Sequence, residues 1–296
     1  MKVSVIGLCG NSLFYELDEM PKKGETIKAD NLHTELGGKG FNQAVTLAYL
    51  GANVSFLCAM HDDSIKKEAL DFSKKENIDC HIALKKLPSP HATILVDKKG
   101  NNEVIVYRGS IDELNDNDID NFKDNIINSD CLLLQYELPL NVIRKAIDIA
   151  KNYGVLVVLN PAPYVYDDIE LLRKVDIITP NEIEAKSIFK LDELNEEKLI
   201  KKIKEYGLKK VVITLGEKGA YIYDNGKSKY IKAYKSTVVD TTGAGDVFNG
   251  SLVYSLLEGN SLIEACDFAC MQSAKSVSKK YALSSIPKEK GYINEK

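Results

Sequence analysis

The sequence predicts an α/β fold: a three-layer α/β/α sandwich with a central, mainly parallel sheet and a small second β-sheet beside it. Short apolar runs of strand length alternate with segments of helical period along most of the chain. The runs are apolar at consecutive positions, which is typical of parallel strands buried on both faces. Two segments, 12–36 and 91–108, instead alternate between polar and apolar residues and predict half-exposed strands.

The elements of the main sheet are predicted in chain order from these patterns. The predicted strands are 3–7, 53–59, 131–135, 155–160, 175–179 and 210–215. The predicted helices are 41–50, 64–77, 140–152, 182–189 and 195–206, with a further helix that begins at Asp246. Gly51 directly follows the first helix, at the position that favours a left-handed backbone and ends a helix.

The two alternating segments predict a lid. The second contains a hairpin that turns at Lys99-Gly100-Asn101. Because both segments leave the main sheet and return to it, we expect them to cover the ends of the parallel strands, where open α/β sheets bind ligands. The predicted division is a core of 1–11, 37–90 and 109–296 and a lid of 12–36 and 91–108.

Composition excludes several classes of function. The chain has 296 residues and a net charge of −4, without a basic, aromatic-rich surface for nucleic acid or anionic lipid. Its start, MKVSVIG, lacks a secretory signal, and no run approaches the ~18 apolar residues that cross a bilayer. The cysteines and histidines lack metal-ligand spacing. These features predict a cytoplasmic protein that acts on small solutes.

The stretch DTTGAGD, 240–246, combines acids with flexible glycines just before a helical pattern. Gly243 and Gly245 allow successive N–H groups to point toward one anion, and the helix adds its positive end. Asp246 at this point predicts a base that takes a proton from a hydroxyl as the hydroxyl attacks a phosphoryl group. The alternative is that Asp246 only caps the helix.

Three further motifs have both a structural and a functional interpretation. ELGGKGFNQA (35–44) is a tight connection to a helix or a sugar-binding loop, and it lacks the spacing of a Walker A motif. DIITPNEIE (176–184) places Asn181 and Glu184 either in a capping box or beside phosphates and a hydrated Mg²⁺. TLGEKGA (214–220) is a hairpin or a close approach to a nucleotide.

Two of these motifs resemble the signature regions of the PfkB carbohydrate-kinase family. They are GGKGFNQA near the start and DTTGAGDVFNG near the end, and between them LNPAP, DIITPNE and VVITLG have the ribokinase-like form. The resemblance extends from about Val3 to Pro287. It implies the ribokinase-like α/β/α sandwich with a β-sheet lid, ATP as phosphoryl donor, Mg²⁺, and transfer to a primary hydroxyl of a small neutral sugar.

The resemblance also implies roles for individual residues. Asp246 corresponds to the catalytic base, and the amides of Gly243, Ala244 and Gly245 correspond to the anion hole. The sugar contacts implied are Gly10, Ser12, Gly38, Lys39, Asn42 and Glu137. The nucleotide contacts implied are Asn181, Thr214, Gly216, Gly219 and Cys270. Glu184 corresponds to a residue that holds Mg²⁺ through water, and Asp240 and Thr242 to a site for a monovalent cation such as K⁺.

Two positions depart from the family pattern. The family carries Asn-x-Asp after the first strand, whereas this chain has Gly10-Asn11-Ser12 and so lacks the carboxylate that grips two sugar hydroxyls. Losing a charge-assisted hydrogen bond costs on the order of 1.5 to 3 kcal/mol, so the acceptor is left open. D-ribose leads, with fructose, another pentose or a nucleoside behind it. Tyr281 stands where glycine is usual, so cation activation is open too.

Two other classes of protein compete with a kinase. GLCG (7–10) suggests an oxidoreductase, but it lacks the third glycine of a dinucleotide fingerprint and no helical pattern follows it directly. A sugar-binding protein without catalysis would explain Ser12, although it would have no physical reason to keep Asp246. The apolar faces of the lid strands also predict a homodimer formed through the lid.

Overall fold

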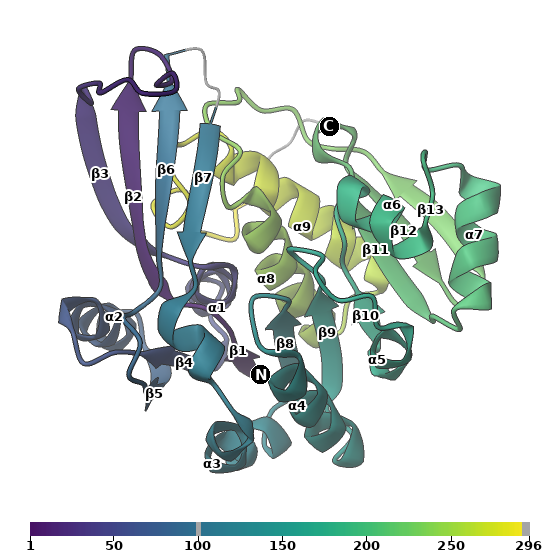
Figure 1. Cartoon of the computed structure of the whole chain (residues 1–296). Helices are drawn as coiled ribbons and strands as arrows, with labels where there is room; N and C mark the ends of the chain where they lie inside the picture. The colour runs from purple at the N-terminus through teal and green to yellow at the C-terminus, as the bar shows by residue number, and fades with distance from the viewer. Residues whose placement is uncertain (99–101, 292–296) are drawn as a thin grey trace.

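A nine-stranded sheet forms the centre of the molecule, and a separate four-stranded sheet projects from one end of it (Figure 1). This computed structural model describes residues 1–98 and 102–291. The larger sheet has the order β13-β12-β11-β10-β9-β8-β1-β4-β5, and its pairs are parallel from β5 to β11. Its strands are β1 Lys2–Ile6, β4 Asn53–Met60, β5 Ile78–Leu84, β8 Cys131–Gln135, β9 Leu156–Asn160, β10 Ile177–Ile178, β11 Lys210–Thr214, β12 Ala220–Asp224 and β13 Lys227–Ile231.

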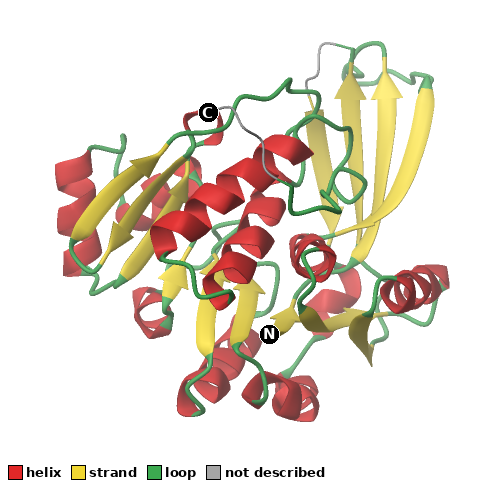
Figure 2. Cartoon of the chain, turned by 180° about the vertical axis from the view of Figure 1, so that it is seen from behind, coloured by secondary structure: helices red, strands yellow, loops and turns green. Residues whose placement is uncertain are grey.

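Helices cover both faces of this sheet, and each face has its own apolar core (Figure 2). One face is covered by α1 Lys39–Tyr49, α2 Ser64–Lys75, α8 Ala244–Leu257 and α9 Leu262–Ser276. The other is covered by α3 Asp116–Ile127, α4 Leu140–Asn152, α5 Ile169–Lys174, α6 Glu182–Phe189 and α7 Glu196–Glu205. Two 3₁₀ turns, η1 Gly109–Glu113 and η2 Gly216–Lys218, complete the helical elements. Alternate residues of β8 enter opposite cores, so the sheet is buried on both faces as predicted.

Polar side chains set where several helices begin. The carboxylate of Asp63 accepts hydrogen bonds from the backbone N–H groups of Ile65 and Lys66, both at 3.1 Å, at the start of α2. Asn115 and Ser261 begin α3 and α9 with complete capping boxes. No helix in the described part of the chain is long and apolar enough to span a bilayer.

The four-stranded sheet, called the lid below, has the order β3-β2-β6-β7. Its strands are β2 Gly10–Leu17, β3 Asn31–Gly37, β6 His91–Asp97 and β7 Asn102–Tyr107. β2 runs parallel to β6, and each pairs antiparallel with its outer neighbour. The first predicted segment is therefore two strands separated by a non-strand stretch, 18–30. The predicted hairpin turn at Lys99-Gly100-Asn101 lies outside the described residues.

Most predicted elements of the larger sheet are confirmed. β8, α4 and α6 have the predicted bounds, and Gly51 follows α1 with φ of +94°. The hairpin interpretation of TLGEKGA is also confirmed, because β11 pairs antiparallel with β12. β5, α5 and α9 were not predicted from the sequence.

Candidate active site

The predicted catalytic residues lie at the start of α8, and three of the predicted sugar contacts, Gly38, Lys39 and Asn42, lie at the start of α1. Glycines shape both helix starts. Gly38 precedes α1 with φ of +110°, and a Cβ there would lie 2.3 Å from the carbonyl oxygen of Leu8. Gly243 precedes α8 with φ of +78°. Both positions require backbone angles that favour glycine, so the two bare helix starts come close to neighbouring backbone.

Asp246 lies in the first turn of α8, buried with 8% of its surface exposed. Its Oδ2 accepts a hydrogen bond from Asn42 Nδ2 at 3.0 Å, and its Oδ1 accepts one from Gln43 Nε2 at 3.0 Å. Burial raises the pKa of Asp246, while Lys39, Asn42 and Gln43 act in the opposite direction. The carboxylate is thus a stronger base than an exposed aspartate, and two amides from α1 hold it in one orientation.

Lys39 is the cation shared by three carboxylates. We call Lys39, Asn42, Glu137, Glu184 and Asp246 the Lys39 cluster. Burial of Lys39 opposes its charge, but Asp246, Glu137 and Glu184 together raise its pKa.

Glu137 follows β8 and accepts a hydrogen bond from the backbone N–H of Lys39 at 2.9 Å. Burial raises the pKa of Glu137 to about 7, with Lys39 lowering it and Asp246 raising it. Burial also raises the pKa of Glu184. The cluster thus holds three carboxyl groups and one ammonium group, and burial raises the pKa of each carboxyl group.

The three amides predicted to form an anion hole differ in their hydrogen bonds. The N–H of Ala244 donates to the carbonyl of Thr241 at 3.2 Å. Among the described residues, the N–H groups of Gly243 and Gly245 donate to no backbone carbonyl across a turn or loop. These two amides, with the positive end of α8, are therefore the donors best available to an anion.

Asn181 and Glu184 form the predicted capping box at the start of α6. The side chain of Glu184 accepts from the backbone N–H of Asn181 at 2.8 Å, and the side chain of Asn181 accepts from the backbone N–H of Glu184 at 2.9 Å. Each of these bonds uses one oxygen, and Glu184 still interacts electrostatically with Lys39 and Asp246. The structural interpretation is thus confirmed without removing Glu184 from the Lys39 cluster.

The residues predicted to contact the nucleotide follow the ends of β10 and β11. Thr214 forms an isolated parallel bridge with Asn181. Gly216 and Gly219 begin and end the turn after β11, both with positive φ, and a Cβ at Gly219 would lie 2.0 Å from the carbonyl oxygen of Ile231. Cys270 is buried within α9 in the core.

The predicted cation site is built around Asp240. One carboxylate oxygen accepts from Thr242 N at 2.9 Å and Thr242 Oγ1 at 2.7 Å, and the other accepts from Tyr281 N at 2.8 Å. Tyr281 has φ of +70°, the backbone that glycine would adopt without strain. Tyr281 therefore occupies a left-handed backbone conformation that glycine adopts more readily.

Gly10 and Ser12 lie on β2 of the lid, beside the end of β3 that leads into α1. A Cβ on Gly37 would lie 2.3 Å from Ser12 Oγ, so the Ser12 side chain is close to the bare turn before α1. The side-chain oxygens of Asn11 and Asn42 are buried and accept no hydrogen bond from the described residues. The Asn42 oxygen, beside Asp246, is available to a hydroxyl donor of a ligand.

Three buried amides near Asp246 were not predicted as site residues. Gln43 contacts Asp246 directly, Gln135 donates to Gln43 at 2.7 Å, and Gln43 donates to Asn160 at 3.3 Å. The signal in the sequence is that Gln135 and Asn160 each end an otherwise apolar strand. Polar residues at the carboxyl ends of adjacent parallel strands point to a ligand site.

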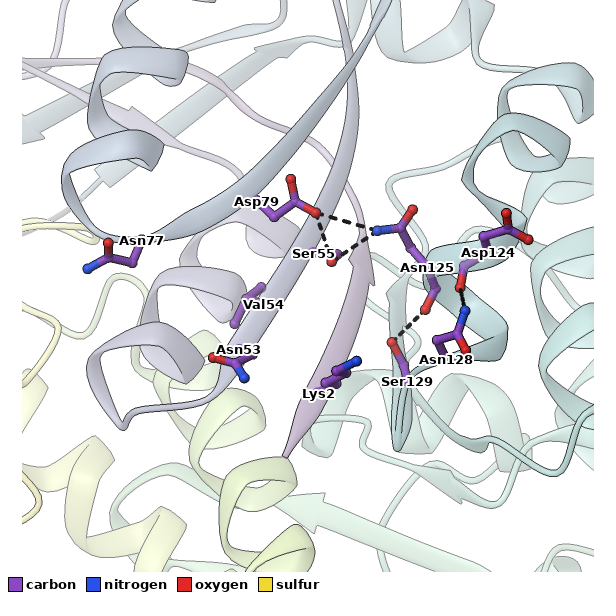
Figure 3. Close-up of a pocket in the computed structure, with 10 residues that line it drawn as sticks. All are labelled: Lys2, Asn53, Val54, Ser55, Asn77, Asp79, Asp124, Asn125, Asn128 and Ser129. Carbon is purple, nitrogen blue, oxygen red and sulfur yellow. Dashed lines mark hydrogen bonds between the residues drawn. The ribbon is translucent and has the colours of Figure 1, made fainter.

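An open hollow of about 520 Å³ lies at the opposite ends of these strands (Figure 3). It is lined by polar side chains around the starts of β1 and β4, where Ser55 and Asn125 form hydrogen bonds with Asp79 and with each other. The hollow lies at the amino ends of the strands and is therefore separate from the Lys39 cluster. Open parallel sheets bind their ligands at the carboxyl ends of the strands, where the Lys39 cluster lies.

Comparisons with known proteins agree with this architecture. The sequence pattern of the pfkB family carbohydrate kinases matches residues 1–289. A ribokinase of Haemophilus influenzae is 39% identical over 290 residues, covering 96% of this chain and 95% of the relative.

Solved structures give the same result. The crystal structure of a Thermotoga maritima ribokinase superposes with a TM-score of 0.87 and 35% identity, over 96% of this chain and 95% of the other. An Arabidopsis thaliana ribokinase complexed with ribose and ATP superposes with a TM-score of 0.85 and 28% identity, over 96% and 95% of the two chains. The ribokinase-like sandwich with its lid is thereby confirmed.

Proposed function

The chain belongs to the pfkB family of carbohydrate kinases, and from this premise we propose that it transfers a phosphoryl group from ATP to a primary hydroxyl of a small neutral sugar, with D-ribose as the leading acceptor. One observation carries the proposal: a buried carboxylate, Asp246, lies in the first turn of a helix whose start also carries available backbone amides.

Each part of this arrangement has a chemical task. Asp246 takes the proton of the acceptor hydroxyl as its oxygen bonds to phosphorus. The amides of Gly243 and Gly245 stabilise negative charge on the transferred group, and Ala244 joins them if its bond to Thr241 opens. Lys39 neutralises charge between the two reactants. This assignment requires the hydroxyl and the phosphate to meet beside the start of α8.

The residues present fit a hydrated Mg²⁺. Among the described residues, no group of three or more acidic, histidine or cysteine side chains could hold a metal ion by itself. Mg²⁺ usually keeps several waters and binds through one or two carboxylates and the substrate phosphates. Glu184, which interacts electrostatically with Lys39 and Asp246, is the proposed carboxylate. When bound, Mg²⁺ offsets negative charge on the phosphates, which the acid-rich Lys39 cluster does not do alone.

The nucleotide would lie along the ends of β10 and β11. Asn181, Thr214, Gly216 and Gly219 would line this edge, and a Cβ at Gly216 would meet no atom within 4 Å. Cys270, buried in α9, would contact the nucleotide only from the core side.

The charges favour a neutral acceptor over a sugar phosphate. Arg108, which follows the lid strand β7, pairs with Asp112 at 2.7 Å. Gly10, Ser12, Gly38, Lys39, Asn42 and Glu137 are the proposed sugar contacts. Because Ser12 provides no carboxylate, fructose, another pentose or a nucleoside is the alternative acceptor.

A monovalent cation such as K⁺ is proposed beside Asp240 and Thr242. The Asp240 carboxylate already accepts three hydrogen bonds, so backbone carbonyls of this loop are the available ligands. The left-handed backbone at Tyr281 supports such a site.

The lid supports a proposed homodimer. The outer strand β7 exposes Val104, Ile105 and Val106, with 68% of Ile105 accessible. An apolar edge strand is a surface that proteins normally cover.

The proposed division into a core (1–11, 37–90, 109–296) and a lid (12–36, 91–108) follows the two sheets. We propose a cytoplasmic location because the enzyme consumes ATP.

An acceptor screen tests this function. Purified protein with Mg·ATP is assayed for ADP release with pentoses, hexoses, nucleosides and their phosphates. We expect at least one free sugar to be phosphorylated, with D-ribose among the best. ADP release that no acceptor stimulates would contradict the proposal and favour a protein that binds sugar without catalysis.

A further inference from the structure

Gln43 is a buried amide that contacts the proposed base and is itself held by two other amides. It lies on α1 and is fully buried. Its Nε2 donates to Asp246 Oδ1 at 3.0 Å and to Asn160 Oδ1 at 3.3 Å. Its Oε1 accepts from Gln135 Nε2 at 2.7 Å. The three amides therefore connect α1, β8 and β9 to the first turn of α8.

The direction of these hydrogen bonds is fixed from the backbone. Asn160 Nδ2 donates to the carbonyl of Thr179 at 2.8 Å, so Asn160 Oδ1 must face Gln43 as an acceptor. Gln135 supplies an N–H to the oxygen of Gln43. The Asn160 contact requires the Gln43 nitrogen to face Asn160 and Asp246, since the opposite amide orientation would bring two acceptors together. Gln43 thus offers Asp246 only a donor.

Space for this network is built into the backbone. A Cβ at Gly7 would lie 2.6 Å from Gln135 Oε1, and a Cβ at Gly40 would lie 2.7 Å from it. Two glycines thus leave room for the amide that orients Gln43. Gln43 itself is fully buried and makes three side-chain hydrogen bonds, which hold its amide in place beside Asp246.

Asn42, the other donor to Asp246, is held less firmly. Its Nδ2 donates to Asp246 Oδ2 at 3.0 Å, but its Oδ1 is buried without a partner among the described residues. Asn42 can therefore change partners when a ligand with hydroxyl groups binds, whereas Gln43 cannot. The two carboxylate oxygens of Asp246 consequently differ: Oδ1 is committed to Gln43, and Oδ2 is adjacent to the adaptable amide.

We propose that Gln43 is the positioning residue of the catalytic base, fixing Oδ1 of Asp246 so that Oδ2 receives the proton of the acceptor hydroxyl. This inference rests on the proposed kinase function. In the step it supports, the hydroxyl oxygen bonds to the terminal phosphorus of ATP, the bond from that phosphorus to ADP breaks, and the hydroxyl proton moves to Oδ2. Gln43 contacts neither reactant and acts through Asp246 alone.

The electrostatic surroundings make this role measurable. Burial raises the pKa of Asp246, and Lys39, Asn42 and Gln43 each lower it. Asp246 in turn raises the pKa of Glu137 and of Glu184. Removing the Gln43 donor should therefore leave Asp246 protonated to a higher pH.

The test is the pH profile of kcat/KM for Gln43→Met, which keeps the side-chain length but removes the donor. A hydrogen bond to a charged group corresponds to about one pH unit or more, so the acid limb should move up by about one unit. Activity should fall about tenfold at pH values below the acid limb, and this loss should shrink as the pH rises above the limb. Thr46→Val is the matched control, because Thr46 is buried on α1 and bonds only to the Asn42 carbonyl. Its acid limb should match that of the parent.

A double-mutant cycle separates positioning from general stability. In an Asp246→Asn background, Gln43→Met should change the residual rate by less than about twofold, because the two residues act as one unit. If Gln43→Met fails to fold, Gln43→Glu, which has the same shape, replaces it and should move the acid limb further upward. An acid limb that does not move, or a loss that is additive with Asp246→Asn, would overturn the inference. Asp246→Asn that works like the parent would instead overturn the proposed function.

Discussion

Two buried carboxylates of similar exposure, Glu35 and Asp246, have very different surroundings. Glu35 has 6% of its surface exposed and Asp246 has 8%. Glu35 accepts four hydrogen bonds from the loop that follows α9, namely from the N–H groups of Ala282, Leu283 and Ser284 and the hydroxyl of Ser284. Asp246 accepts two from side chains, so hydrogen-bond donors rather than burial distinguish the two sites.

The residues around Glu35 connect the lid to the core. We call Phe14, Glu16, His33 and Glu35, together with 280–284, the lid anchor. The ring of Tyr281 stacks on His33 with ring centres 3.7 Å apart, and its hydroxyl lies 3.1 Å from Glu16.

The same loop also reaches the proposed site. Tyr281 N donates to Asp240, and a Cβ at Gly243 would lie 3.0 Å from Ala282. In the lid anchor, the carboxylate of Glu35 accepts hydrogen bonds from four donors, which stabilises the fold. In the Lys39 cluster, by contrast, the buried side-chain oxygen of Asn42 has no hydrogen-bond partner among the described residues and can bind a substrate.

The largest effect should come from Asp246→Asn. Removing the base should lower kcat/KM by roughly 10³-fold or more, since positioned general bases contribute about 10²–10⁴-fold. The free energy of unfolding should stay within about 1 kcal/mol of the parent, because the variant keeps the shape and removes a buried charge. Steady-state kinetics and urea unfolding measure the two quantities. Parent-like turnover would show that Asp246 is not the catalytic base and does not differ from Glu35 in function.

Glu35→Ala should show the opposite pattern. It leaves several N–H groups of the 282–284 loop without an acceptor, so the free energy of unfolding should fall by about 2–4 kcal/mol, roughly 30- to 800-fold in the unfolding equilibrium. Urea unfolding measures this loss. Glu25→Ala is the control, because exposed Glu25 accepts a bond only from the nearby Lys22 N–H, and it should cost less than about 0.5 kcal/mol. Equal losses in the free energy of unfolding for Glu35→Ala and Glu25→Ala would contradict a stabilising role of the lid anchor.

Glu137→Gln should weaken binding of the sugar and should raise the free energy of unfolding at high pH. Because burial raises the pKa of Glu137 to about 7, the folded state binds a proton more tightly than the unfolded state. The stability contributed by the protonated form is present at pH 4 and is lost as pH rises through 7.

Gln cannot ionise, so the variant should gain about 1–3 kcal/mol at pH 8 and nothing at pH 4, measured by urea unfolding at both values. KM for the sugar should rise. A gain that is the same at both pH values would assign the effect to packing instead.

Ser12→Asp should have the smallest effect. It adds the carboxylate that the family pattern carries at this position, so KM for D-ribose should fall about tenfold through charge-assisted hydrogen bonds. Kinetics with D-ribose and 2-deoxy-D-ribose in parallel would show whether the gain depends on the 2-hydroxyl. An unchanged or higher KM would mean that the acceptor does not approach β2.

The fold could be predicted further than the site. β8 and α4 were placed to the residue because a fully apolar run and a strong helical period leave few alternatives. β5 was missed because it is a half-exposed edge strand with a mixed sequence, and α5 because it is only one and a half turns long.

The glycine motifs predicted both helix starts at the site, but the contacts between distant residues left no pattern in the sequence. Gln43 and Gln135 meet across 92 positions. Glu35 meets the 282–284 loop across about 250. Neutral amides and a lone glutamate have many structural uses, so their partners emerged only in three dimensions.

The pairing of β2 with β6 has a consequence for how the protein folds. Ser12 pairs with Ala92, so the middle of the lid sheet joins segments separated by α1, β4, α2 and β5. Closing such a long loop costs entropy that only long-range strand contacts repay, and parallel pairing of this kind forms slowly. We therefore expect the lid to assemble after the core. In a newly made chain, the sheet that carries the proposed sugar contacts Gly10 and Ser12 would then be among the last parts to fold.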